Sequence, residues 1–180
     1  MSRGKRFFSP ELFSGKSLLI FMLAAWAFYL SSSQVYLRLE NAKTHAPLFW
    51  LKVRGNDAFS LSYRHPTDGT VYVEHYRIMK GKAFELTGLT FRSSHERGHS
   101  RYGIPKNLSN GWRTFQGLHE IKKDIPFVVD SVTRNGYALL IHGKKYFLTR
   151  FTRPGTSVVF RVDRRRQFVV FVWKIEEWLR

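Results

Sequence analysis

The sequence predicts an all-β fold, an antiparallel β-sandwich or small barrel, preceded by one N-terminal transmembrane helix. From residue 38 onward, apolar and polar residues alternate with a period of two in short runs, and turn residues recur roughly every 8 to 12 positions. Almost no segment shows the 3.6-residue period of an amphipathic helix. Before that point, residues 17–37 carry no charge, which is typical of a hydrophobic helix.

The uncharged N-terminal segment is the predicted membrane anchor. At about 1.5 Å per residue, a helix over residues 17–37 spans a hydrocarbon core of roughly 30 Å. The preceding segment, residues 1–16, is basic, and basic residues favour the cytoplasmic side. We therefore expect a single-pass protein in which residues 38–180 form a domain on the side of the membrane opposite to the cytoplasm. A cleaved signal peptide is the alternative, because Ala25, Trp26 and Ala27 resemble a cleavage site.

The β-rich domain is predicted to begin with short strands and turns. Residues 58–65 and 70–79 read as a hairpin, because Pro66, Thr67, Asp68 and Gly69 supply turn chemistry between them. The tail, residues 168–180, is expected to begin as a buried strand and to end in one helical turn. The remaining predicted strands are residues 48–53, 83–91, 125–132, 137–141, 145–151 and 156–163.

Composition limits the chemistry. The chain has 180 residues, enough for one domain with a buried core, and no cysteine, which excludes disulfides, thiolate zinc sites and a cysteine nucleophile. Its formal net charge of +17, from 30 Lys and Arg against 13 Asp and Glu, attracts anionic partners. Because export removes the domain from nucleic acid, we expect no nucleic-acid partner and favour an anionic membrane surface or an acidic protein.

Basic residues are dense near the end of the predicted domain. Between residues 144 and 166, eight Lys and Arg stand against a single acidic residue, Asp163. We expect Arg161, Arg164, Arg165 and Arg166 to bind an anionic surface such as lipid headgroups, and a solvated face is the competing interpretation. An envelope protein that binds anionic lipid or polymer through this region is one alternative function.

Residues 93–105, SSHERGHSRYGIP, contain the pattern H-E-x-x-H in His95, Glu96 and His99. In zinc hydrolases the two histidines of this pattern lie at i and i+4 on one helical face. Here a glycine lies inside the pattern, serines flank it and no apolar residue would anchor a helix, so a polar loop is predicted. Glu120 qualifies as a third ligand only by its distance in sequence. A zinc-dependent hydrolase is a second alternative function, but we expect no cofactor.

The candidate binding residues are Tyr63, His65 and Glu74 on the predicted hairpin, with the loop of residues 93–105. Loops gather at one end of a β-sandwich, so these residues favour a recognition patch for a partner protein or a small ligand. The competing interpretation is that His65 bonds a backbone carbonyl at the turn and Glu74 pairs with an arginine on the outer face. Catalysis is not expected, because no nucleophile, base and orienting group occur at a recognisable spacing.

Three segments carry a resemblance to a known family: FSLSYRHPTDGTVYVEHYRI, LTFRSSHERGHSRYGIP and GKKYFLTRFTRPGTSVVFRVDRR. In order and spacing they are similar to the bacterial family catalogued as domain of unknown function 1850, over roughly residues 49–166, and the chain resembles a divergent member of it. Pro66, for example, stands where the family has a serine. The residues that fall on the family pattern are Tyr63, His65, Thr70, Glu74, Tyr76, Phe91, Ser93, Gly103, Pro105, Pro154, Gly155 and Thr156.

The resemblance implies a small secreted or membrane-anchored β protein, encoded beside TAXI-type tripartite ATP-independent periplasmic (TRAP) transporters. It adds Gly103 and Pro105 to the expected binding residues Tyr63, His65 and Glu74. The function that we expect is therefore a membrane-anchored periplasmic accessory protein, not an enzyme. Its expected partner is the permease or the solute receptor of such a transporter.

Overall fold

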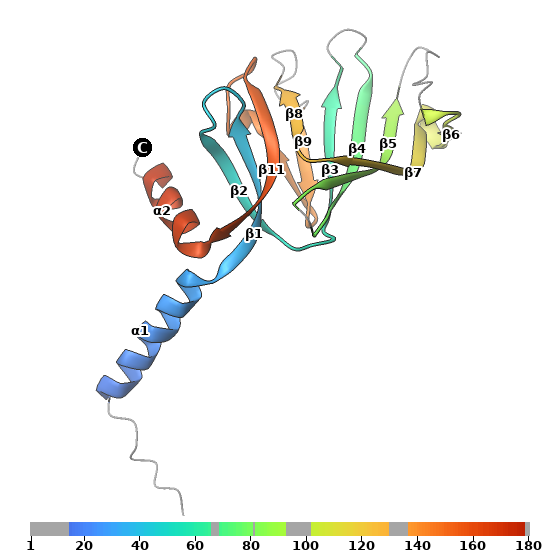
Figure 1. Cartoon of the computed structure of the whole chain (residues 1–180). Coiled ribbons are helices and arrows are strands. Elements are labelled where there is room, and N and C mark those ends of the chain that lie inside the picture. The colour runs from blue at the N-terminus through green and yellow to red at the C-terminus, as the bar shows by residue number, and fades with distance from the viewer. Residues whose placement is uncertain (1–14, 66–68, 81, 93–101, 130–136, 179–180) are drawn as a thin grey trace, which may run out of the picture. The chain divides into compact units, whose positions relative to one another are not determined.

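Two antiparallel sheets packed as a sandwich form most of the described chain (Figure 1). This computed structural model describes residues 15–65, 69–80, 82–92, 102–129 and 137–178. The chain divides into two units: Val35–Arg164 holds the sandwich, and Met1–Gln34 together with Arg165–Arg180 holds two helices. The predicted antiparallel β-sandwich is confirmed, with a helix near each end of the chain.

The smaller sheet has four strands in the order β2-β1-β11-β8. β1 pairs antiparallel with β2, and β11 pairs antiparallel with β8. β8 is therefore an edge strand of this sheet within the described residues. The bounds are β1 (Ser33–Asn41), β2 (Pro47–Val53), β8 (Ile125–Val128) and β11 (Ser157–Arg166).

The larger sheet has seven strands in the order β10-β9-β3-β4-β5-β7-β6. The predicted hairpin is present in β3 and β4, where the His65 N–H donates to the Thr70 carbonyl at 2.8 Å and closes the turn. The bounds are β3 (Ala58–Arg64), β4 (Val71–Ile78), β5 (Phe84–Arg92), β6 (Lys106–Asn107), β7 (Arg113–Lys122), β9 (Ala138–Ile141) and β10 (Lys144–Phe147).

Strands β1, β6 and β7 lie outside the strands that the sequence predicts. In β7 the alternation is interrupted near Gly117, whose φ is 71°. The register between β5 and β7 shifts there, from the pair Leu86 and Glu120 to the pair Gly88 and Gln116. A bulge of this kind moves the side chains out of strict alternation, and a search for a period of two therefore passes over the strand.

The core lies between the two sheets and is built by alternate residues of each strand. Its fully buried side chains include Leu37, Leu39, Leu61, Ile78, Phe84, Leu139, Val158 and Phe160. In the hairpin, Leu61 pairs with Glu74, and Phe59 pairs with Tyr76. Because paired residues share one face of a sheet, Glu74 lies on the inner, apolar face.

The helix expected over residues 17–37 is shorter at its C-terminal end than predicted. The helix α1 (Gly15–Ser31) stops at Ser31, and β1 begins at Ser33. The hydroxyls of Ser31 and Ser32 donate to the carbonyls of Phe28 and Tyr29 at 2.8 and 2.7 Å, so they satisfy acceptors of the last turn and end the helix. Among the residues that the structure describes, no helix has both the length and the apolar character needed to cross a membrane.

The expectation of a buried strand in the tail is wrong, because these residues form the helix α2 (Gln167–Trp178). The apolar residues Phe168, Phe171, Val172 and Ile175 recur at the i, i+3, i+4 and i+7 spacing of one helical face. Within the helical unit, the Gln167 N–H donates to the Ser32 carbonyl at 3.1 Å, and its side-chain amide donates to the Ser32 hydroxyl at 3.2 Å. The end of α1 is thereby bonded to the start of α2.

Candidate functional site

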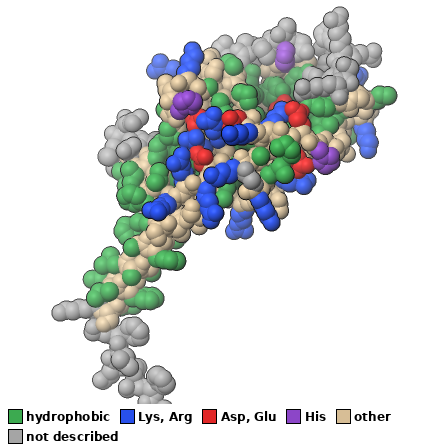
Figure 2. Space-filling model, in the orientation of Figure 1, with side chains coloured by type: hydrophobic (Ala, Val, Ile, Leu, Met, Phe, Trp, Pro, Cys, Tyr) green, Lys and Arg blue, Asp and Glu red, His purple; other side chains and the backbone are tan. Residues whose placement is uncertain are grey.

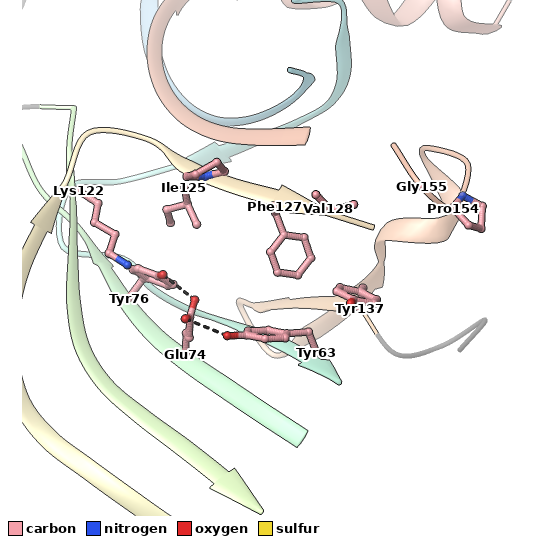
Figure 3. A pocket seen from close by; sticks show the side chains of 11 residues that line it. Tyr63, Glu74, Tyr76, Lys122, Ile125, Phe127, Val128, Tyr137, Pro154 and Gly155 are labelled. Atoms are coloured by element: carbon pink, nitrogen blue, oxygen red, sulfur yellow. Dashed lines mark hydrogen bonds between the residues drawn. The ribbon is translucent and has the colours of Figure 1, made fainter. Parts of the chain in front are cut away.

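A pocket of about 780 Å³ opens between the edge strand β8 and the inner face of the larger sheet (Figure 3). This volume lies within the range of small-ligand sites, roughly 300 to 1,000 Å³. All of its lining belongs to the sandwich unit. The lining residues are Tyr63, Glu74, Tyr76, Lys122, Ile125, Pro126, Phe127, Val128, Tyr137, Pro154 and Gly155.

The Glu74 carboxylate is the acidic group of this pocket. Figure 3 shows the hydroxyls of Tyr63 and Tyr76 pointing at it from two sides. Tyr63 donates to Oε1 at 3.1 Å, and Tyr76 donates to Oε2 at 2.7 Å. Each oxygen therefore accepts a hydrogen bond from a neutral donor, which fixes the orientation of the carboxylate but leaves its charge in place.

Both tyrosines keep their protons firmly. Burial, followed by the charge of Glu74, raises the pKa of the Tyr63 hydroxyl far above its ordinary value of about 10. The same causes in the same order raise the pKa of Tyr76. Neither hydroxyl acts as a base at neutral pH, and both remain available as hydrogen-bond donors.

The place of Glu74 follows from the strand period. Tyr72, Glu74, Tyr76 and Ile78 alternate along β4, and all but Glu74 are buried apolar residues of the core. Successive side chains of a strand point to opposite faces, so Glu74 shares the inner face with its neighbours at a spacing of two. The interpretation that pairs Glu74 with an arginine on the outer face is therefore wrong.

Three aromatic rings from three segments build one wall of the pocket. The Phe127 ring, on β8, meets the Tyr63 ring edge-on, with centroids 5.3 Å apart and an interplanar angle of 83°. It also meets Tyr137 edge-on, at 4.9 Å and 76°. The Tyr63 and Tyr137 rings are nearly parallel, at 14° and 6.2 Å. Mutual contact of this kind holds ring orientations, so the wall is largely formed before a ligand arrives.

A charged pair lies at the β7 side of the pocket. The Lys122 ammonium lies 5.9 Å from the centre of the Tyr76 ring and 3.7 Å from a carboxylate oxygen of Glu120. The other Glu120 oxygen accepts a hydrogen bond from the Tyr102 hydroxyl at 2.9 Å. Among the described residues, Lys122 is therefore the basic side chain that lines the pocket. It forms an ion pair with Glu120.

The predicted site residues are only partly brought together. Tyr63 and Glu74 line the pocket, whereas His65, Gly103 and Pro105 are not among its lining residues. The exposed His65 ring contacts Tyr72 edge-on, with centroids 6.1 Å apart. Gly103 is exposed and Pro105 half-buried, on the segment before β6.

The metal candidates His95, Glu96 and His99 lie outside the described residues. Glu120, the third ligand considered from sequence spacing, bonds Tyr102 and Lys122 instead. Within the described ranges, no group of three or more metal-ligating side chains is present.

The four predicted basic residues fall into two environments. Arg161 forms ion pairs with the fully buried Glu40 and with Asp124, the latter with nitrogen and oxygen 3.1 Å apart. Arg164, Arg165 and Arg166 are exposed at the end of β11. Figure 2 shows many Lys and Arg side chains on the visible face of the sandwich, with hydrophobic side chains along α1. Binding of an anionic surface by these exposed arginines stays a prediction, whereas Arg161 is engaged in ion pairs within the sandwich.

Comparison of the chain with protein-family models, curated proteins and solved structures finds no match. The site is therefore defined by its geometry. Sequence reasoning missed Lys122, Phe127 and Tyr137, which come from separate segments and meet only in the folded sandwich. The position of Glu74 on the inner face of β4 could have been predicted from the sequence. It is separated by two or four residues from Tyr72, Tyr76 and Ile78, and residues at such even spacings share one face of a strand.

Proposed function

We propose that this protein is a membrane-attached binding protein whose sandwich takes a small ligand in the pocket beside β8. The observation that carries the proposal is the Glu74 carboxylate, held by Tyr63 and Tyr76 inside an apolar pocket of about 780 Å³. A mostly apolar cavity with a few convergent polar groups is the usual form of a small-molecule site.

The lining favours binding over catalysis. Among the described residues that line the pocket, none is a serine, threonine, cysteine or histidine. Tyr63 and Tyr76 hold their protons, so neither is an activated nucleophile or a general base. The remaining polar groups, Glu74 and Lys122, can orient a ligand by charge and hydrogen bonds.

A small ligand fits the site better than an added peptide strand. β8 has only four residues and an exposed edge, but Pro126 has no N–H to donate to a new strand. Short, proline-containing edges discourage strand addition. The ligand is therefore expected to be held by side chains of the pocket.

The helical unit supports attachment to a bilayer. On α1, the side chains Leu19, Ile20, Phe21 and Phe28 are 60%, 66%, 68% and 77% exposed, so they cover successive directions around the helix. Apolar groups this exposed are stabilised by burial in lipid. The periplasmic location of the sandwich stays a prediction from the basic residues before α1, since no described helix is long and apolar enough to cross a bilayer.

A role as accessory to a TAXI-type TRAP transporter remains a proposal that rests on the family resemblance. Five residues that carry this resemblance, Tyr63, Glu74, Tyr76, Pro154 and Gly155, also line the pocket. If the family pattern is selected for ligand binding, its residues are expected to lie together at the pocket, as these five do. Copurification with a TRAP permease or solute receptor would support the link, and deletion without any transport defect would argue against it.

The binding proposal is tested by removing part of the pocket wall. The Phe127 ring points from β8 into the pocket (Figure 3), whereas Ile121, on β7, lies outside the pocket and is 56% exposed. Phe127→Ala should remove the central ring of the aromatic wall, while Ile121→Ala shortens an apolar side chain elsewhere. We expect fluorine NMR of a mixture of cationic, anionic and neutral fluorinated aromatic fragments to detect binding to the full-length protein and to Ile121→Ala, with loss in Phe127→Ala. Equal binding by both variants would contradict the proposal.

A further inference from the structure

We infer that the ligand of this pocket is an organic cation, an amine or related nitrogen base with an apolar body, bound by Glu74 through its charged nitrogen. This inference rests on the proposed binding function and specifies its ligand class. It depends on the charge balance at Glu74, on the rings around it and on the position of Lys122.

No described side chain balances the charge of Glu74. Its hydrogen-bond partners in the described chain are two neutral hydroxyls, and no ion pair joins it to a described basic side chain. This is notable in a chain with 30 Lys and Arg against 13 Asp and Glu. Glu74 is half-buried, and a carboxylate that a bound ligand removes further from water is stabilised by a compensating cation. A cationic ligand would supply that charge.

The carboxylate retains capacity to bind such a nitrogen. An ionised carboxylate offers about four lone-pair positions, and the two tyrosine hydroxyls use two of them. An ammonium group that approaches from the pocket can therefore donate to Glu74 without displacing Tyr63 or Tyr76. Hydrogen bonds between two charged groups are among the stronger ones in proteins.

The aromatic wall suits the same chemistry. Tyr63, Phe127 and Tyr137 line the pocket and contact one another, so their π systems surround the space next to Glu74. Ring faces attract cations, and the attraction grows when the cation leaves water. The same rings would pack against the apolar body of the ligand.

Lys122 is the internal competitor for this position. Its ammonium already lies over the Tyr76 ring, at 5.9 Å, and its ion-pair partner Glu120 is 3.7 Å away. For a cationic ligand, the charge of Lys122 is repulsive. For an anionic ligand, it would be the attractive group, so the effect of removing Lys122 separates the two classes by sign.

The test uses three probes of similar size: 2-phenylethylammonium, 3-phenylpropionate and 2-phenylethanol. Their dissociation constants would be measured by NMR at neutral pH on the full-length protein in detergent, with Phe127→Ala as control for partition into micelles. We expect the ammonium probe to bind about tenfold tighter than the other two, as one charge-assisted hydrogen bond predicts. Tightest binding by the propionate would overturn the inference.

Two variants of nearly unchanged side-chain size test the roles of the Glu74 and Lys122 charges separately. Glu74→Gln should weaken the ammonium probe about tenfold and leave 2-phenylethanol unchanged. Lys122→Met should tighten the ammonium probe, an effect that a misfolded variant cannot produce. Weaker ammonium binding in Lys122→Met would contradict the inference.

The two proposals fail in different ways. Binding of only the neutral or anionic probe, lost in Phe127→Ala, would keep the binding function and remove the cationic ligand. Absence of binding by every probe and by the fluorinated fragments would remove both.

Discussion

The Tyr76 hydroxyl donates a 2.7 Å hydrogen bond to the Glu74 carboxylate, two residues earlier on the same strand. This contact is possible because residues at i and i+2 share one face of a strand. A carboxylate thereby lies among the apolar side chains between the sheets, and after burial its charge is the next largest cause that raises the pKa of Tyr76.

The first prediction concerns alkaline stability. Folding raises the pKa of Tyr63 and Tyr76 by burial and by the Glu74 charge, whereas an unfolded tyrosine titrates near 10. Above about pH 10 the unfolded chain releases protons that the folded chain retains, so the free energy of unfolding should fall as pH rises. The two tyrosine hydroxyls contribute fully to the free energy of unfolding below pH 10. Above pH 10, each hydroxyl lowers that free energy by up to about 1.4 kcal/mol per pH unit.

Denaturant unfolding from about pH 9 to pH 11 measures this slope. The double variant Tyr63→Phe with Tyr76→Phe should show a shallower fall than the wild type. Ultraviolet titration of the eight tyrosines should show at least two that ionise only when the protein unfolds, and fewer such groups in the double variant. An unchanged slope in the double variant would mean that these hydroxyls are not the raised ones.

The second prediction concerns Gly88, which lies in β5 next to the bulge. A Cβ added there would lie 3.0 Å from the Phe115 backbone carbonyl and 3.5 Å from the His75 ring. Because backbone cannot move aside, Gly88→Ala should destabilise the protein by about 1 to 3 kcal/mol. Gly55→Ala is the control, since it meets only the flexible Lys80 side chain at 3.4 Å. Chemical denaturation should separate the two variants, and equal stabilities would argue against the register at Gly88.

The third prediction concerns the acid cluster of the smaller sheet. Glu40 is fully buried and pairs with Arg38 at 2.7 Å and with Arg161. Glu40→Gln should cost about 3 kcal/mol of unfolding free energy, the lower end for a broken buried pair, because Asp163 and Asp124 still bind the two arginines. Glu85→Gln, which loses contacts to exposed partners, should cost less than about 1 kcal/mol. A similar loss in both variants would mean that the Glu40 pairs contribute no more than surface pairs.

The fourth prediction concerns α2 and lipid. Phe171 and Ile175 lie on its exposed apolar stripe, and Lys174 lies off that stripe. The chain has no cysteine, so Phe171→Cys and Lys174→Cys can each carry a single environment-sensitive fluorophore. In vesicles of phosphatidylethanolamine and phosphatidylglycerol, the label at 171 should shift to shorter wavelength and the label at 174 should not. Identical emission at both sites would speak against contact of the stripe with lipid.

Much of the fold could be predicted from the sequence, because alternation of apolar and polar residues indicates a strand with one buried face. The hairpin of β3 and β4 was predictable for this reason, and its turn residues gave the register. β7 was not, since its bulge breaks the alternation. α2 was mistaken for a strand because valine and phenylalanine favour strands, although their spacing fits a helix.

The candidate site was predictable only in part. Tyr63 and Glu74 belong to one hairpin, so local pairing brings them together. Phe127 and Tyr137 reach the same pocket through contacts across the two sheets. No local pattern reports a contact between residues so far apart in the chain.

The most direct test of the central claim is a set of nuclear Overhauser effects between bound 2-phenylethylammonium and the methyl groups of the full-length protein. We predict effects at Ile125, which points into the pocket beside Glu74 (Figure 3), and none at Ile121, which lies outside it. Effects confined to Ile121 or to methyl groups of α1 would contradict the account, because the probe would then bind without entering the pocket.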